Sequence, residues 1–112
     1  MSAEPAVDLD RTLAALADPQ RRRALELLGE RPHRAGELAA ALDLAPSVMS
    51  RHLKVLREGG LVAEAHPDFD ARVRVYSLRS GSLGDLKRWL AAVEEGWSVQ
   101  LAALKRHVEE AP

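Results

Sequence analysis

The chain contains no cysteine and no long apolar run. Without cysteine among its 112 residues, a disulfide framework and a thiolate metal site are both excluded. No apolar stretch approaches the roughly 20 residues of a membrane span. Residues 1–7 also lack the basic start and apolar run of a signal peptide. We therefore expect a cytoplasmic protein with no membrane segment.

The chain also has no marked excess of charge of either sign. The formal net charge is −1, from 16 Lys and Arg against 17 Asp and Glu, which argues against coating nucleic acid over the whole surface. Residues 18–79 nevertheless carry eleven basic and nine acidic residues, whereas the segments on either side are net acidic. Because a polyanion responds to the local distribution of charge, this middle segment is the candidate contact region.

The remaining composition fits one folded domain. The chain is 46% hydrophobic and 29% charged, as globular proteins are, and its length supports one core without room for a second catalytic domain. There is no internal repeat and no low-complexity linker. We therefore expect a single domain over residues 1–112.

Apolar spacing and capping residues predict the first two helices. Leu9, Leu13 and Leu16 recur at helical spacing and indicate a helix over residues 8–17. Asp18 is a good N-cap for a second helix, because its carboxylate can accept hydrogen bonds from the first backbone N–H groups. Gly29 and Pro32 mark the end of that helix.

Two further helices follow with only a short turn between them. "AGELAAALDL" predicts a short third helix, and a fourth begins at Pro46 and ends at Gly59 and Gly60. Its apolar stripe is predicted to be buried and consists of Met49, Leu53 and Leu56. This order is typical of a helix-turn-helix.

The next segment predicts a β-hairpin, which would be the wing of a winged helix. "LVAEA" and "RVRVYSL" are β-type runs joined by turn residues that include Asp68 and Asp70, so the wing spans residues 61–78. Strand alternation puts Arg72 and Arg74 on the same side as Tyr76. If that side is buried, two charged side chains there would be unfavourable. We therefore expect the two arginines near the loop tip, beyond the edge of the core.

The exposed face of the fourth helix suits the DNA major groove, which is about 12 Å wide. The DNA-binding residues predicted on this helix are Pro46, Ser47, Ser50, Arg51 and Lys54. The serines and the N-terminal backbone N–H groups suit phosphates or base edges, Arg51 suits guanine, and Lys54 suits phosphate. Arg72 and Arg74 would extend the contact to an adjacent minor groove or to the backbone.

Three segments resemble the ArsR family of bacterial winged-helix transcriptional regulators: "ADPQRRRALELL", "GELAAALDLAPSVMSRHLKVLREGGLV" and "RVRVYSL". The resemblance runs from about Leu9 to Glu110, and its most specific part is S-x-H-L-x-x-L at residues 50–56 followed by glycine and a wing. It implies a homodimer bound to operator DNA, with repression as the usual outcome.

Several other residues can be interpreted either as functional or as purely structural. Residues 21–23 are three arginines at a helix start, where their charge opposes the helix dipole and a phosphate would relieve the cost. We assign a phosphate contact to one of these arginines and take Arg22 as the candidate, although the sequence does not decide among the three; a solvated helix start is the alternative. For His52 we favour a structural hydrogen bond over a base contact. Trp89 and Trp97 are interpreted as packing residues.

The sequence departs from the family in its metal ligands. Ala39 and Ala41 stand where the family's thiolate site has a C-x-C pair, which excludes soft-metal binding there. For the family's second site, on the last helix, His107 and Glu110 match one half, but Gly96 replaces a histidine. Two ligands of four make a poor zinc site. We therefore expect a regulator without metal or other cofactor, and its effector stays unknown.

The final helix is predicted over residues 82–110, with Ser82 as its N-cap. Its apolar residues follow helical spacing, and this stripe is too long for a small winged helix to cover alone. We therefore expect a homodimer, and the alternative is a helix folded back onto its own core through Leu86 and Leu90. The predicted interface residues are Leu9, Leu13, Leu16, Leu86, Leu90, Val93, Trp97, Leu101 and Leu104.

Two other classes of function were weighed. A winged helix that binds another polypeptide stays the alternative, because fold alone does not dictate function. An enzyme is not expected, since the four histidines are scattered and no nucleophile–base pair or phosphate-binding glycine loop is present. The sequence thus predicts a mainly α protein with a small β-hairpin, a winged helix-turn-helix with dimerisation helices at both ends.

Overall fold

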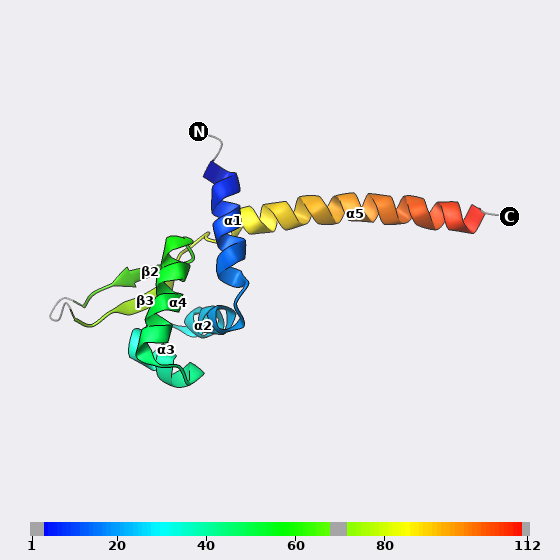
Figure 1. Ribbon diagram of the computed structural model, residues 1–112. Coiled ribbons are helices and arrows are strands. Elements are labelled where there is room, and N and C mark those ends of the chain that lie inside the picture. Colours follow the sequence, from blue (N-terminus) through cyan, green and yellow to red (C-terminus); the bar gives the residue numbers. More distant parts are fainter. Residues whose placement is uncertain (1–3, 68–71, 111–112) are drawn as a thin grey trace.

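The computed structural model describes residues 4–67 and 72–110. In chain order the elements are α1 (Glu4–Leu16), α2 (Pro19–Glu30), β1 (His33–Arg34), α3 (Ala35–Leu42), α4 (Pro46–Glu58), β2 (Val62–Ala65), β3 (Val75–Leu78) and α5 (Gly84–Glu110). Helices α2, α3 and α4 cluster beside the small sheet, and α5 extends away from them as one long helix (Figure 1).

Both terminal helices differ from their predicted bounds. Helix α1 begins at Glu4, four residues before the expected start, with Pro5 in its first turn, where a missing N–H breaks no helical bond. Helix α5 begins at Gly84, because the preceding residues form a turn: the Ser82 N–H donates to the carbonyl of Arg79 at 3.2 Å, and Gly81 has φ +74°. Ser82 is therefore not the N-cap.

The hairpin is part of a three-stranded sheet, so the prediction of two strands was incomplete. The sheet order is β1-β3-β2, and both pairs are antiparallel. His33 of β1 lies opposite Tyr76, and Glu64 of β2 lies opposite the same residue from the other side. Strand β1 has only two residues, too few to show the alternation by which strands are predicted. The turn predicted at Asp68 and Asp70 lies outside the described residues.

The core lies between the helices and the inner face of this sheet. The predicted stripe of α4 is confirmed, because Met49, Leu53 and Leu56 are all at most 1% exposed. Other fully buried large side chains are Leu38, Leu61 and Val62. Burying a leucine of this kind contributes about 1.5 to 3 kcal/mol. The buried stripe therefore fixes which face of α4 points outward.

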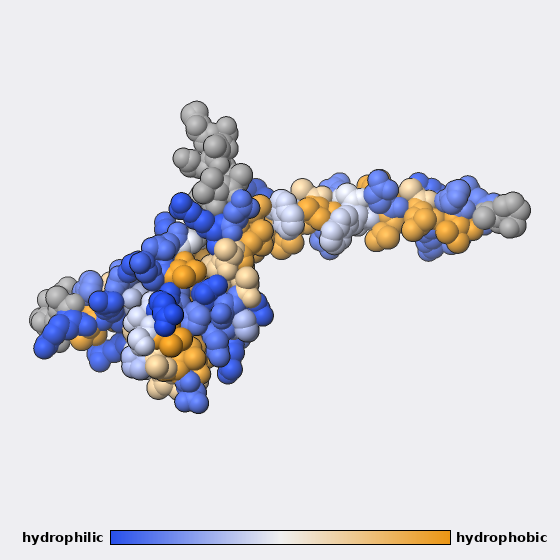
Figure 2. Space-filling view, in the orientation of Figure 1, coloured by the Kyte–Doolittle hydropathy of each residue, from blue (hydrophilic) through white to orange (hydrophobic). Residues whose placement is uncertain are grey.

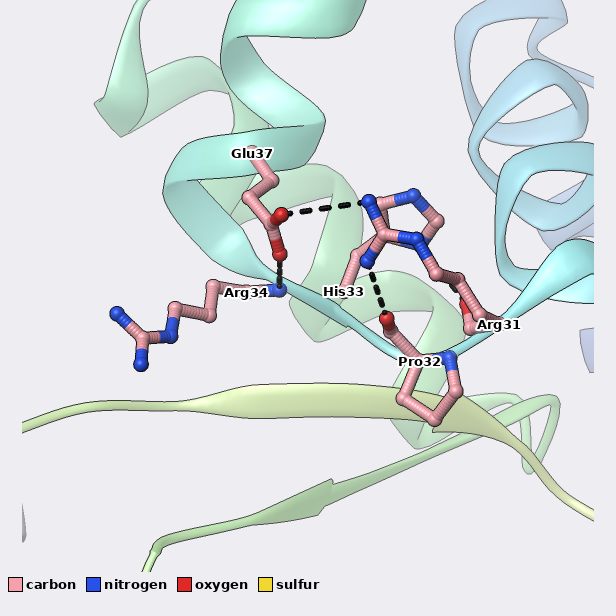
Figure 3. A network of polar contacts seen from close by, with 5 residues as sticks. All are labelled: Arg31, Pro32, His33, Arg34 and Glu37. Carbon is pink, nitrogen blue, oxygen red and sulfur yellow. Dashed lines mark hydrogen bonds and ion pairs between the residues drawn. The ribbon is translucent and has the colours of Figure 1, made fainter.

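Side-chain caps define where α2 and α3 begin. The Asp18 carboxylate accepts from the N–H groups of Gln20 and Arg21 at 2.7 and 3.3 Å, as predicted for an N-cap. At α3, Glu37 accepts from the Arg34 N–H at 2.8 Å and also meets the Arg31 guanidinium at 3.4 Å (Figure 3). Both caps satisfy donors that the first helical turn leaves unpaired.

Electrostatics at the two caps follow from these bonds. Burial acts to raise the pKa of Asp18, but the backbone N–H groups of Gln20 and Arg21, together with the nearby side chains of His52 and Arg21, outweigh it and the pKa falls below its ordinary value. The pKa of Glu37 is also lowered, chiefly by the Arg34 N–H and further by Arg31, against some burial. Both carboxylates therefore stay ionised at neutral pH.

Candidate nucleic-acid interface

Helix α4 is held at both ends by local backbone geometry. The turn before it contains Asp43 in the left-handed conformation, φ 56°, and the Leu44 N–H donates to the Ala39 carbonyl at 2.9 Å. At its end Gly60 has φ +77°, which suits a residue without Cβ, and the Leu61 N–H closes the helix on the Leu56 carbonyl at 3.0 Å. The helix therefore has a fixed start, end and rotation.

The outward face of α4 carries the side chains predicted to meet DNA. Those exposed on it are Pro46, Ser47, Ser50, Arg51 and Lys54. Because Met49 and Leu53 are buried on the opposite side, the polar residues share one surface. Serine hydroxyls and cations on an exposed helix face suit the donor and acceptor groups of the DNA major groove.

Wing residues lie next to this face. A hollow of about 260 Å³ is lined by Ser47, Ser50, Arg51, Lys54, Arg57, Arg74 and Tyr76. A second hollow, of about 480 Å³, shares Ser50 and Arg74 with it and adds Arg34 and Arg72. The fold thus brings the predicted α4 and wing residues together. Both predicted wing arginines are exposed, and both precede β3, which is shorter than the β-type run predicted over residues 72–78.

Sequence reasoning missed the residue that joins these two parts. Glu64 on β2 is ion-paired with Arg57 at the end of α4 and with Arg74 Nε at 3.5 Å, and its carboxylate accepts from the Tyr76 hydroxyl at 3.2 Å. We call these four residues the Glu64 cluster. Nothing in the local sequence pattern marks Glu64, since the contact requires α4, β2 and β3 to be in place.

The buried tyrosine completes this cluster. Tyr76 is 3% exposed, and burial together with the neighbouring Glu64 carboxylate raises its pKa, against a hydrogen bond from Arg74. The hydroxyl therefore remains protonated at neutral pH and donates to Glu64. One carboxylate consequently holds two cations and one phenol between the helix and the wing.

The arginines at the start of α2 have partners inside the chain. Arg21 donates from Nε to the Ala15 carbonyl at 2.7 Å and from Nη2 to the Ala14 carbonyl at 3.1 Å. Arg22 donates to the Leu16 carbonyl at 2.6 Å. These carbonyls are the negative end of the α1 dipole. The protein itself therefore offsets the positive charge at the start of α2, for which a phosphate contact had been predicted. Arg22 is exposed, and its phosphate contact stays a prediction.

Most of the predicted dimer residues are left uncovered by the rest of the chain, although Leu16 packs against the core. Leu9, Leu16, Leu86 and Val93 are half-buried; the exposed residues are Leu13, Leu90, Trp97, Leu101 and Leu104. Along the whole of α5, residues 84–110, no side chain is buried, and Trp97 is 66% exposed. Apolar residues follow one side of this helix in Figure 2. A hollow of about 530 Å³ lies where α5 leaves the core, and Leu25, Leu61, Leu78 and Leu83 contribute to its lining.

The described part of the chain shows neither a group of metal ligands nor a membrane helix. Within residues 4–67 and 72–110, no three His, Cys, Asp or Glu side chains are grouped so as to hold a metal ion. Ala39, at the first of the family's thiolate positions, is buried, whereas Ala41 is exposed. In the same part of the chain no helix is long and apolar enough to cross a membrane.

A capped helix that presents serines and cations beside an arginine-bearing wing defines a winged helix-turn-helix DNA-binding protein. The family model described as bacterial regulatory protein, arsR family, matches residues 18–64. The transcriptional regulator Rv2034 of Mycobacterium tuberculosis is 38% identical over 78 residues, which is 70% of each chain. Rv0081 of the same organism is 36% identical over 77% of this chain and 75% of that one.

Solved structures of similar proteins lead to the same family. The ArsR-like transcriptional regulator from Rhodococcus sp. RHA1 is 28% identical, and the two chains align over their full lengths with a TM-score of 0.78. This confirms the predicted fold, a mainly helical winged helix-turn-helix with a long C-terminal helix. The chain therefore belongs to the arsR family of bacterial transcriptional regulators, which are not enzymes.

Proposed function

We propose that the chain is a repressor that binds an inverted-repeat operator as a homodimer and needs no metal ion. The observation that carries this proposal is the single surface formed by the exposed face of α4 and the wing arginines. In it, Arg51 reads guanine, and Lys54, Arg72 and Arg74 contact the backbone or the adjacent minor groove. Binding chromosomal DNA implies that the protein acts in the cytoplasm.

The homodimer is supported by the pattern of apolar residues on α5. They are Leu86, Leu90, Val93, Trp97, Leu101, Leu104 and Val108. Their spacing of 4-3-4-4-3-4 reads the same in both directions, with Trp97 at its centre. A helix with such a pattern matches an antiparallel copy of itself, in which a two-fold axis perpendicular to the helices passes through the contact at Trp97. The homodimeric winged helix-turn-helix domain Mb0332 of Mycobacterium bovis, 22% identical, has a similar fold with a TM-score of 0.65.

The repeat also fits the shape of α5. Leu86, Trp97 and Val108 are separated by eleven residues, a period close to that of a straight α-helix. With 27 residues, α5 is about 40 Å long. An antiparallel pair centred on Trp97 would place Leu90 of one subunit beside Leu104 of the partner subunit. In this arrangement α1 adds Leu13 to the edge of the contact.

A two-fold dimer sets the form of the operator. Two recognition helices related by such an axis enter successive major grooves about 34 Å apart. The operator is therefore an inverted repeat whose half-sites are separated by roughly one helical turn. Repression follows because a dimer on such a site excludes polymerase when the site overlaps a promoter.

The experiment that tests the proposal uses the DNA upstream of the protein's own gene. We expect retardation of this DNA that weakens steeply with salt, because cationic contacts release counterions from phosphates. Footprinting then locates the two half-sites. Unrelated DNA of equal length is the control, since it reports binding without sequence recognition. A parent protein that binds neither DNA at any salt would favour the alternative, a winged-helix module that binds another protein.

A further inference from the structure

The Glu64 cluster places a carboxylate inside a surface that otherwise carries cations. The side chain of Glu64 is 17% exposed, and it contacts Arg57, Arg74 and Tyr76, which line the hollow beside α4. A carboxylate there repels phosphate and weakens DNA binding. We therefore expect it to have a structural role that offsets this cost. Its contacts indicate what that role is.

Each contact of Glu64 reaches a different part of the DNA-binding surface. Arg57 belongs to the last turn of α4, while Arg74 immediately precedes β3 in the wing. Tyr76 is directly opposite Glu64 in the β2–β3 register, and its hydroxyl donates to the carboxylate at 3.2 Å. Glu64 is thus the shared partner of one cation from the helix and one from the wing.

The two arginines remain available to a ligand while they contact Glu64. Arg57 and Arg74 side chains are 41% and 54% exposed. Arg74 uses Nε for the ion pair, and a guanidinium has five N–H donors in a planar fork. An arginine that is already held by such contacts loses less side-chain entropy on meeting a phosphate or a base edge.

We propose that Glu64 is a positioning residue for operator recognition: by holding Arg57 and Arg74 together, it sets the wing at a fixed distance from the recognition helix. This inference rests on the proposed DNA-binding function and adds two residues to it, Glu64 and Arg57. Glu64 is expected to affect the affinity for DNA in general and the specificity for the operator in opposite directions. The carboxylate weakens binding to DNA in general, and the geometry that it imposes favours the operator.

The test compares operator DNA with unrelated DNA of the same length, at a salt concentration low enough for every variant to bind. Glu64→Gln removes the charge and weakens both ion pairs. We expect about tenfold weaker operator binding, with binding to unrelated DNA unchanged or tighter. Glu64→Asp keeps the charge but withdraws the carboxylate by one methylene, and we expect a smaller loss in the same direction.

The matched control is Glu58→Gln, which removes an exposed carboxylate from the same end of α4. It should tighten binding to both DNAs by the same small factor. In an Arg74→Ala background, Glu64→Gln should cost the operator complex less than threefold, because one of the two arginines that it positions is gone. Urea midpoints of the free proteins identify any variant that is misfolded.

Two results would overturn the inference. One is operator binding by Glu64→Gln that is as tight as that of Glu58→Gln, which would make Glu64 only a repelling charge. The other is an undiminished loss in the Arg74→Ala background, which would show that Glu64 does not act through that arginine. A parent protein that fails to distinguish operator from unrelated DNA contradicts the proposed function itself, and is recognised before any variant is made.

Discussion

Nη1 of Arg21 lies 3.3 Å from Nδ1 of His52, so the first turn of α2 is tied to the middle of α4. A guanidinium cannot accept a hydrogen bond, and Nδ1 must therefore be the acceptor, with the ring proton on Nε2. The other nitrogens of Arg21 bind carbonyls at the end of α1. One side chain thus connects α1, α2 and α4.

The first prediction follows from this connection. Arg21→Ala leaves the Ala14 and Ala15 carbonyls without their charged donor, and we expect the free energy of unfolding to fall by about 1 to 2 kcal/mol. Urea unfolding at one fixed protein concentration measures it, because a dimer's stability depends on concentration. Arg23→Ala, an exposed neighbour on the same helix, is the control and should change stability by less than about 0.5 kcal/mol. Equal losses in both variants would contradict the assignment.

The second prediction separates a base contact from a phosphate contact. Arg51→Ala should weaken operator binding by about 1 to 3 kcal/mol and relax the base preference at one position, whereas Lys54→Ala should weaken all sequences alike. Each lost phosphate contact should also reduce the slope of log K against log salt by roughly one unit. Titrations at several salt concentrations measure both effects. Parent-like binding by both variants would remove α4 from the interface.

Most of the fold could be predicted because its signals are local. The apolar stripe of α4, the cap at Asp18 and the glycines that end α4 each lie within a few residues of the structure they specify. Strand β1 could not be predicted, since two residues acquire strand geometry only by pairing with β3. The role of Glu64 could not be predicted for a related reason. Its partners are 7 to 12 residues away in the sequence and contact it only in the folded chain.

The third prediction concerns metal ions. With Ala39 and Ala41 at the thiolate positions and Gly96 in place of a histidine, micromolar zinc, cadmium or arsenite should leave operator affinity unchanged. Mobility shifts with each metal and with a chelator measure it. A tight, stoichiometric zinc complex that releases DNA would contradict this prediction and would implicate His107 and Glu110 together with ligands from the partner subunit.

The fourth prediction concerns acid stability. The Arg34 N–H lowers the pKa of Glu37 in the folded protein below its ordinary value of 4.5. A lowered folded-state pKa gives a contribution to stability that is present above pH 4.5 and is lost as the pH falls through the folded-state value. Glu37→Gln removes this dependence, so its unfolding midpoint should drop less than that of the parent on acidification below pH 4.5. Glu30→Gln, at the exposed end of α2, is the control and should follow the parent.

The last prediction concerns the dimer. Trp97→Glu places a carboxylate at the centre of the α5 stripe, where two copies would meet across the axis, and burying two like charges there is unfavourable. We expect sedimentation to show a monomer at micromolar concentration, together with loss of operator binding. Glu94→Gln, on the same helix, is the control and should remain dimeric.

Direction and register of the α5 pair are tested by disulfide trapping, which the absence of native cysteine makes unambiguous. Leu90→Cys and Leu104→Cys proteins are mixed, allowed to exchange subunits and oxidised. An antiparallel pair centred on Trp97 places residue 90 of one subunit beside residue 104 of the other, so the mixed disulfide should dominate. A parallel pair would instead join each variant to itself, and efficient Leu90→Cys self-linking would therefore show that the symmetric stripe pairs in the opposite sense.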